Sequence, residues 1–151
     1  MRRTLSFIGM ILAAAPVWAH HSFAAEFDEK KVVKLQGTVT QMEWVNPHVW
    51  LHLAVKNADG SIANWMIEGN TPNSLLRAGL TKKSLASGME IMVKGYLSRT
   101  GENKASGSSI LMRDGSKLSF GSREGGAVLD WVSSDEELWR RQLAAAAQGG
   151  N

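Results

Sequence analysis

Apolar and polar residues alternate along residues 48–56, and this is the clearest structural pattern in the chain. The apolar positions are Val49, Leu51, Leu53 and Val55. A period of two residues puts these side chains on one face of a β-strand and the intervening ones on the other. The pattern therefore predicts a strand over residues 48–56 with one buried face, and His48, Trp50 and His52 share the opposite face.

Similar strand patterns recur along the middle of the chain, separated by turn signals. Asp59–Gly60 is typical of a hairpin turn, and Asn46–Pro47 ends the first strand pattern. Thr71 is a good capping residue, and Pro72 suits the first position of a helix, so a short helix is expected there. The expected strands cover residues 35–45, 48–56, 62–68, 89–98 and 105–112, with a short return strand at 117–120.

Three strands, a short helix and two further strands follow one another in the order of an OB-fold. The sequence thus predicts a mainly β protein, with a small five- to six-stranded OB-fold-like barrel over residues 35–122. A different small antiparallel barrel or a sandwich is the alternative. Residues 20–34 are expected to form an N-terminal arm, either docked or frayed. Residues 123–151 are expected to form a linker and a C-terminal helix, because Ser133 and the acidic residues after it favour a helix start.

The first 19 residues have the features of a cleavable secretory signal peptide. Arg2 and Arg3 form a positive start, and residues 5–15 form an apolar run. That run is shorter than the ~20 residues of a typical membrane span. Small residues stand at the first and third positions before a cut after Ala19. We therefore predict cleavage there, a periplasmic location and no stable membrane insertion afterwards; an uncleaved anchor is the alternative.

Charge and composition exclude some classes of function. The net charge of the whole chain is +3, and Arg2 and Arg3 would leave with the signal peptide. A nearly neutral protein is not expected to bind nucleic acid by neutralising phosphates. There are no cysteines. No catalytic triad or phosphate-binding glycine loop stands out, and Glu43 and Glu68 are expected on solvated faces. The sequence therefore favours a binding protein over an enzyme.

The strongest chemical candidate is a metal site at the processed amino terminus. Cleavage after Ala19 would make His20 the first residue, whose free amine and ring can chelate one metal ion. His21 adds a second imidazole. Copper is the expected metal, because Cu(II) favours nitrogen ligands in tetragonal geometry. Zinc is the alternative and would prefer four ligands in a tetrahedron.

A third nitrogen ligand is expected from His48 or His52. Four residues along a strand span ~13 Å, so both rings cannot easily bind one ion. His48 is preferred, because it follows Asn46–Pro47 at a strand end that an arm could reach. The alternatives are that the two rings lie in different environments, or that all four histidines are unrelated polar residues.

Three tryptophans form a second candidate site. OB-fold barrels stack sugars or bases on exposed aromatic side chains of their middle strands. Trp44, Trp50 and Trp65 lie on or beside the predicted middle strands. They would make a metal-free module that binds a periplasmic protein or a small ligand. The alternative is that these rings pack against the barrel.

Several separated blocks of the chain resemble one family of bacterial exported proteins that is classed only as a domain of unknown function. The blocks are His20–His21–Ser22–Phe23–Ala24–Ala25–Glu26–Phe27–Asp28, Gly37–Thr38–Val39, Trp44–Val45–Asn46–Pro47–His48–Val49–Trp50 and Gly95–Tyr96. The resemblance covers roughly residues 20–120 and implies a periplasmic β-barrel domain. It implies no reaction.

Overall fold

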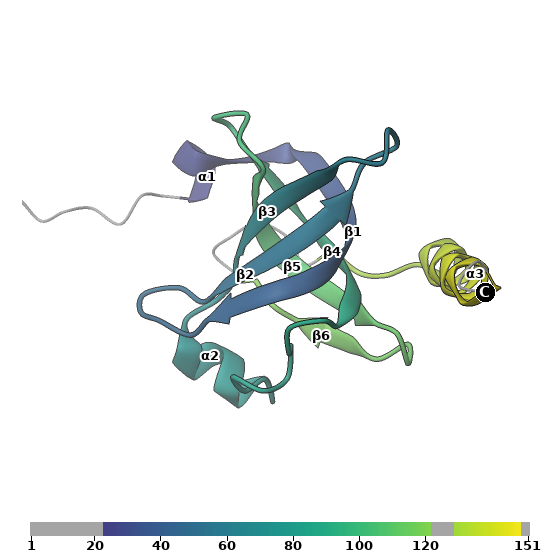
Figure 1. The fold of residues 1–151 in the computed structure, drawn as a ribbon. Coiled ribbons are helices and arrows are strands. Elements are labelled where there is room, and N and C mark those ends of the chain that lie inside the picture. Colours follow the sequence, from purple (N-terminus) through teal and green to yellow (C-terminus); the bar gives the residue numbers. More distant parts are fainter. Residues whose placement is uncertain (1–22, 122–128, 149–151) are drawn as a thin grey trace, which may run out of the picture.

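The computed structural model describes residues 23–121 and 129–148 (Figure 1). Its elements are α1 (Phe23–Glu26), β1 (Phe27–Glu43), β2 (Trp50–Lys56), β3 (Ile62–Glu68), α2 (Pro72–Arg77), β4 (Glu90–Ser98), β5 (Lys104–Met112), β6 (Lys117–Ser119) and α3 (Ser133–Gln148). Most of these boundaries lie within two residues of those that the hydrophobic pattern predicts. The main exception is β1.

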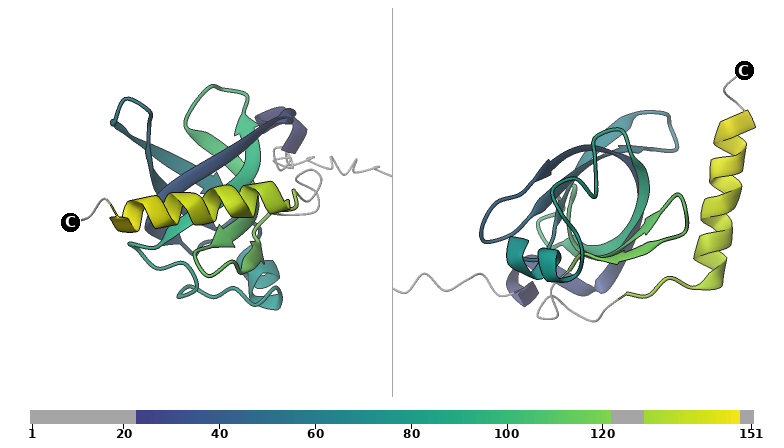
Figure 2. Two further views of the ribbon diagram at one scale, coloured as in Figure 1. Left: turned by 90° about the vertical axis from the view of Figure 1, so that its right-hand side faces the viewer. Right: turned by 90° about the horizontal axis from the view of Figure 1, so that it is seen from below.

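The six strands form one sheet that curls into a barrel-like ring. Their order is β3-β2-β1-β4-β5-β6, and an additional pairing of β3 with β5 closes the ring, as the end-on view in Figure 2 shows. The β3–β5 pairing is parallel and the other pairings are antiparallel. The short helix α2 lies between β3 and β4 in the chain. The predicted mainly β, OB-fold-like architecture is confirmed.

The strand β1 is long because it pairs with two neighbouring strands, β2 and β4. It pairs with β4 from Phe27 to Thr38, with an irregularity before Val32, and with β2 from Thr38 to Glu43. It begins at Phe27, opposite Ser98 of β4, and the Phe27 side chain is buried. Residues 27–34, which the sequence pattern assigns to the arm, thus extend a strand despite their many charges. Gly37 allows the close approach of β2, since a Cβ there would lie 2.8 Å from the carbonyl oxygen of Ala54.

The apolar positions of the alternating segment face the core as predicted. Val49, Leu51 and Leu53 are fully buried. They pack with apolar residues from β1, β3, β4 and β5 and from the segment around α2. Trp50 and His52 are consequently directed to the outer surface, where both are partly exposed.

A second apolar cluster joins α3 to the outside of the ring. Trp131 and Trp139 pack there with Met92 and Leu111, and α3 lies beside the barrel in Figure 2. Leu138 of the same helix is 49% exposed and does not belong to this cluster. In the part of the chain that the structure describes, no helix has the length and apolar character needed to cross a membrane.

Candidate functional site

The start of the described chain is fixed to one end of the barrel. The Nε atom of Arg99 donates hydrogen bonds to the carbonyl oxygens of Ala24, at 2.9 Å, and Phe27, at 3.1 Å. The Phe23 ring stacks on Phe27, with 5.6 Å between centroids, and meets Tyr96 edge-on at 5.5 Å. The expected arm is therefore docked from Phe23 onward.

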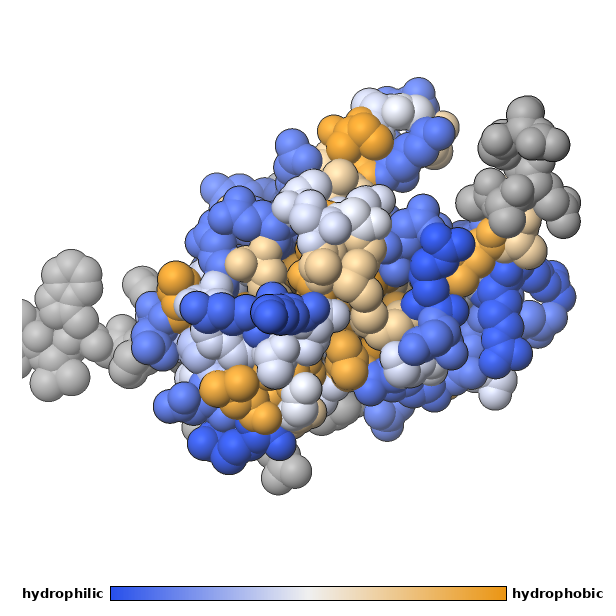
Figure 3. Space-filling model, turned by 60° about the horizontal axis from the view of Figure 1, so that its bottom comes forward, coloured by the Kyte–Doolittle hydropathy of each residue, from blue (hydrophilic) through white to orange (hydrophobic). Residues whose placement is uncertain are grey.

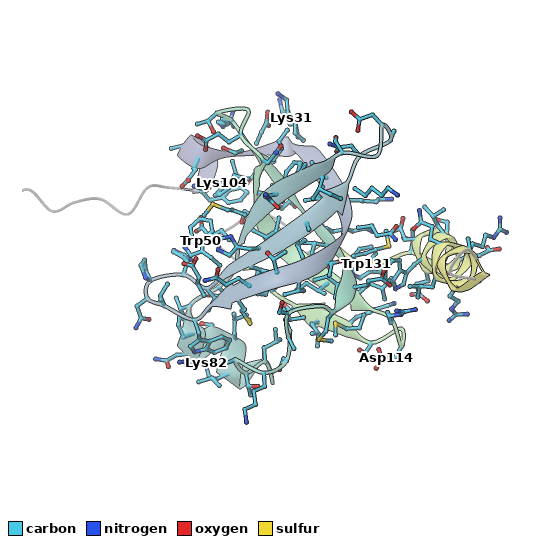
Figure 4. All side chains as sticks on the ribbon, viewed as in Figure 1. Lys31, Trp50, Lys82, Lys104, Asp114 and Trp131 are labelled. Carbon is cyan, nitrogen blue, oxygen red and sulfur yellow. The ribbon has the colours of Figure 1, made fainter. Side chains whose placement is uncertain are left out.

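Lys104 connects this docked segment to the outer face of the strands. Its ammonium pairs with the carboxylate of Glu26. The same ammonium lies 5.0 Å from the centre of the Trp50 ring and 5.8 Å from that of Phe27. Figure 4 shows Lys104 and Trp50 near α1. A cation over aromatic faces is attracted electrostatically, so Lys104 holds α1 against β2 in two ways.

His48 lies next to this cluster, in an orientation that its neighbours define. Its Nδ1 atom is 3.1 Å from the carbonyl oxygen of Gly69 and 3.3 Å from Oε1 of Glu68. A carbonyl oxygen only accepts hydrogen bonds, so Nδ1 carries the proton. In the neutral ring, Nε2 then keeps its lone pair. Metal-binding histidines commonly have this arrangement, in which an outer partner fixes the tautomer.

Glu68 links His48 to the docked segment. It pairs directly across the β2–β3 ladder with Trp50. Burial raises the pKa of Glu68, and the carboxylate of Glu26 raises it further, whereas the charges of His48 and Lys104 act in the opposite direction. These electrostatic effects mean that the four groups share one small region. The sequence pattern predicted Glu68 on a solvated face, but its side chain is only 15% exposed.

His52 lies in a different environment from His48. Its Nε2 atom is 2.8 Å from Oε1 of Glu43 on the neighbouring strand β1. The two histidines thus have separate carboxylate partners, and the structure does not bring them together. His20 and His21 lie outside the described residues. Within residues 23–121 and 129–148, no three side chains among His, Cys, Asp and Glu are grouped closely enough to hold a metal ion.

The three candidate tryptophans are placed differently. Trp44 and Trp65 are partly buried and pack against the main core. Trp50 lies on the outer face, under Lys104. On the face of the molecule shown in Figure 3, apolar residues form separate small areas among polar ones. Trp50 is therefore the one of the three that is available on the outer strand face.

Comparison with known proteins agrees with the family resemblance at the level of an uncharacterised domain. A search of curated proteins found no match. Residues 9–117 match the family of unknown function DUF6152. The match spans most of the chain and contains α1, the strands β1 to β5 and both described histidines. The chain belongs to this family of unknown function, DUF6152.

Proposed function

We propose that this protein is an exported module that binds one divalent metal ion, copper, at its processed amino terminus. The ligands in this proposal are the amine and ring of His20, with the ring of His48 as a third nitrogen and His21 close by. Zinc is the competing metal. The role is carriage or sequestration of the ion, since the proposal includes no reaction.

The geometry of His48 is the observation that carries the proposal. Its Nδ1–H bond to Gly69, supported by Glu68, leaves Nε2 as a bare nitrogen ligand. The side chain is 35% exposed, so an incoming metal ion can reach it.

The docked segment supports the second part of the proposal. Glu68 lies 3.3 Å from His48 and opposite Trp50 on the neighbouring strand, and Lys104 both contacts the Trp50 ring and pairs with Glu26 of α1. The helix α1 therefore lies close to the proposed nitrogen ligand. His20 precedes Phe23 by three residues, which span ~10 Å when extended. Because only three residues connect His20 to the docked Phe23, His20 can reach only a small volume around it. This restriction lowers the entropic cost of bringing the ligands together.

Copper titration of the mature protein tests this proposal. Mass spectrometry of protein purified with its own leader first establishes whether His20 is the terminal residue. His20→Ala and His48→Gln are each expected to weaken Cu(II) binding at least about tenfold, since loss of an outer-shell partner alone typically costs about 10- to 100-fold. His52→Gln is the matched control and is expected to leave Cu(II) affinity unchanged. Equal affinities in the wild type and both test variants would reject the site.

A metal-free binding module on the Trp50 face is the second candidate. Its support is the position of Trp50 on the outer surface of β2, among the strands that OB-fold proteins use for ligands. Trp50→Ala should then abolish capture of a ligand or partner from periplasmic extract, while His48→Gln should not. Capture that is lost in His48→Gln and kept in Trp50→Ala would favour the metal site instead.

A further inference from the structure

The outer face of β2 and β3 contains an exposed methionine directly opposite a histidine. Met66 and His52 are partners in the antiparallel β2–β3 register, so their side chains leave the sheet on the same face. Met66 is 41% exposed, and it is the one methionine among the large apolar residues found exposed in the described ranges. Core packing does not account for a thioether in this position.

The orientation of His52 leaves one ring nitrogen free on the side of Met66. Its Nε2 atom meets Oε1 of Glu43, which lies on β1, on one side of β2. A neutral ring donates its Nε2 proton to that carboxylate, so Nδ1 keeps a lone pair. The two nitrogens lie on opposite edges of the imidazole. Nδ1 therefore points away from Glu43, and the residue opposite His52 on the other neighbouring strand, β3, is Met66.

The spacing of the two side chains suits a shared ion. Directly opposed residues in an antiparallel pair have Cβ atoms ~4.5–5.5 Å apart. Bonds of ~2.0 Å to nitrogen and ~2.3 Å to sulfur put two ligand atoms of one ion at most ~4.3 Å apart. Methionine has three rotatable side-chain bonds and adapts its sulfur position easily. His52 and Met66 can thus bind one ion without a backbone movement.

We propose that Nδ1 of His52 and Sδ of Met66 form a binding site for a soft univalent metal ion, with the chemistry of Cu(I). A thioether ligand selects Cu(I) over the harder divalent ions. Glu43 acts as a positioning residue, because an outer carboxylate fixes the histidine tautomer and increases the basicity of the bound nitrogen. Trp50 lies two residues before His52 on the same face and adds an aromatic surface near the ion.

The neighbouring positive charge does not prevent this binding. Lys104 pairs with Met66 in the parallel β3–β5 register. Its ammonium is paired with Glu26 and lies over the rings of Trp50 and Phe27. The charge is therefore already compensated. The site is also separate from the proposed amino-terminal site, because the two histidines have different partners: His48 contacts Gly69 and Glu68, whereas His52 contacts Glu43.

Silver(I) is the probe for this site, because it shares the ligand preference of Cu(I) and does not change oxidation state in air. The chain has no cysteine, so no thiol competes for the ion. In mature protein labelled at the methionine methyl groups, we expect one methyl resonance to shift and to saturate at one equivalent of Ag(I). Met66→Leu identifies that resonance by its absence.

Variants then define the ligands. Met66→Leu and His52→Gln are each expected to weaken Ag(I) binding at least about tenfold, comparable with the lower end of outer-shell effects. Met42→Leu changes a methionine of β1 that packs against the core and is expected to leave Ag(I) affinity unchanged. A Met66 resonance that does not move, or binding that survives either ligand variant, would overturn the proposal.

His20→Ala separates this inference from the proposed function. It should weaken Cu(II) binding at least about tenfold and leave Ag(I) binding intact. If His20→Ala lost both Cu(II) and Ag(I) binding, silver would be bound at the amino terminus, and the His52–Met66 site would be overturned. Failure of the Cu(II) test alone would leave that site standing, since it does not depend on cleavage after Ala19.

Discussion

Asp135→Asn tests whether one buried carboxylate holds α3 on the barrel. The Asp135 side chain is 5% exposed, and its two oxygens meet the ammonium groups of Lys34 at 2.5 Å and Lys94 at 2.6 Å. Asparagine keeps the size of the side chain and removes the charge. Lys94, whose side chain is 7% exposed, would then lose its anionic partner.

The magnitude follows from the pKa of Asp135. Burial alone would raise this pKa, but hydrogen bonds from Lys34, Lys94 and the backbone of Val132 and the charge of Lys94 together lower it from 3.8 to about 2. The fall of this pKa from 3.8 to about 2 corresponds to ~2.5 kcal/mol before screening. Half of the Lys34 side chain is exposed, so solvent screening reduces this to ~1–2 kcal/mol.

The cost of leaving Lys94 without its carboxylate partner gives a second estimate. Breaking a fully buried ion pair typically costs ~3–5 kcal/mol. Lys94 retains a 2.6 Å hydrogen bond to the carbonyl oxygen of Asp130 and lies 4.7 Å from the centre of the Trp131 ring. These contacts keep the loss below that range. We expect Asp135→Asn to lower the free energy of unfolding by ~2 kcal/mol, between the two estimates.

Urea denaturation followed by tryptophan fluorescence measures this loss. With a slope of ~1–3 kcal/mol per molar urea for a small protein, the midpoint should fall by ~1 M. Glu137→Gln on the same helix is the control, because Glu137 is exposed and pairs with Arg141 alone among the described ion pairs. Its expected cost is below ~0.5 kcal/mol. Equal midpoints for the two variants would refute the assigned role of Asp135.

The difference in free energy of unfolding between the wild type and Asp135→Asn should change with pH in one direction. The pKa of Asp135 is lowered in the folded protein, so its contribution is complete above the unfolded value near 4. It is lost progressively as the pH falls from ~4 through ~2. The stability difference between the wild type and Asp135→Asn should therefore shrink over that interval. A difference that stays constant would show that the charge is not its source.

Three further substitutions test other parts of the structure. Gly95→Ala should destabilise the barrel strongly in thermal unfolding, because the new Cβ would lie 2.3 Å from the carbonyl oxygen of Ser106; unchanged melting would contradict this close approach. Thr71→Ala should cost ~1 kcal/mol in urea unfolding, because Thr71 Oγ1 accepts the hydrogen bond of the Ser74 amide at the start of α2. Phe23→Ala should speed hydrogen exchange of the Glu26 and Phe27 amides and leave the core strands protected, because its ring stacks on Phe27 and Tyr96. Protection that is unchanged there would mean that Arg99 and Lys104 suffice to hold α1.

The fold was predictable because local patterns and connectivity agree. The alternation around Leu51 defines a two-faced strand, Asp59–Gly60 defines the hairpin, and Thr71–Pro72 defines the helix between the third and fourth strands. The start of β1 was not predictable in the same way. Residues 28–31 show no alternation, and they continue the strand between two positions at which β1 pairs with β4, Phe27 opposite Ser98 and Val32 opposite Tyr96. That pairing is a tertiary effect.

The candidate site was predictable only in part. The pattern correctly puts Trp50 and His52 on the outer face, because a two-residue period fixes the face of every residue in a strand. It could not identify Glu68 or Lys104 as their neighbours. Those contacts depend on the β2–β3 and β3–β5 registers, and the second of these joins strands that are far apart in the sequence. Residue type alone gave no sign of them.

The helices α1 and α3, which lie outside the barrel, are attached to it in the same way. In each case a lysine of the barrel pairs with a carboxylate and lies over a tryptophan ring. On one side, Lys104 of β5 pairs with Glu26 and lies over Trp50. On the other, Lys94 of β4 pairs with Asp135 and lies over Trp131. Figure 4 shows Trp50 and Trp131 on opposite sides of the barrel in that view.

The two attachments are not equally strong. The Lys94 side chain is 7% exposed and that of Lys104 is 22% exposed, so water screens the second pair more. Rising salt should therefore weaken the Lys104–Glu26 attachment of α1 before the Lys94–Asp135 attachment of α3, because screening acts first on the more exposed pair. Since α1 leads directly to the proposed metal-binding terminus, we expect salt to weaken Cu(II) binding at His48 while the tryptophan environment around α3 is unchanged. Simultaneous loss of both would mean that the two attachments are energetically one unit, contrary to their separate contacts.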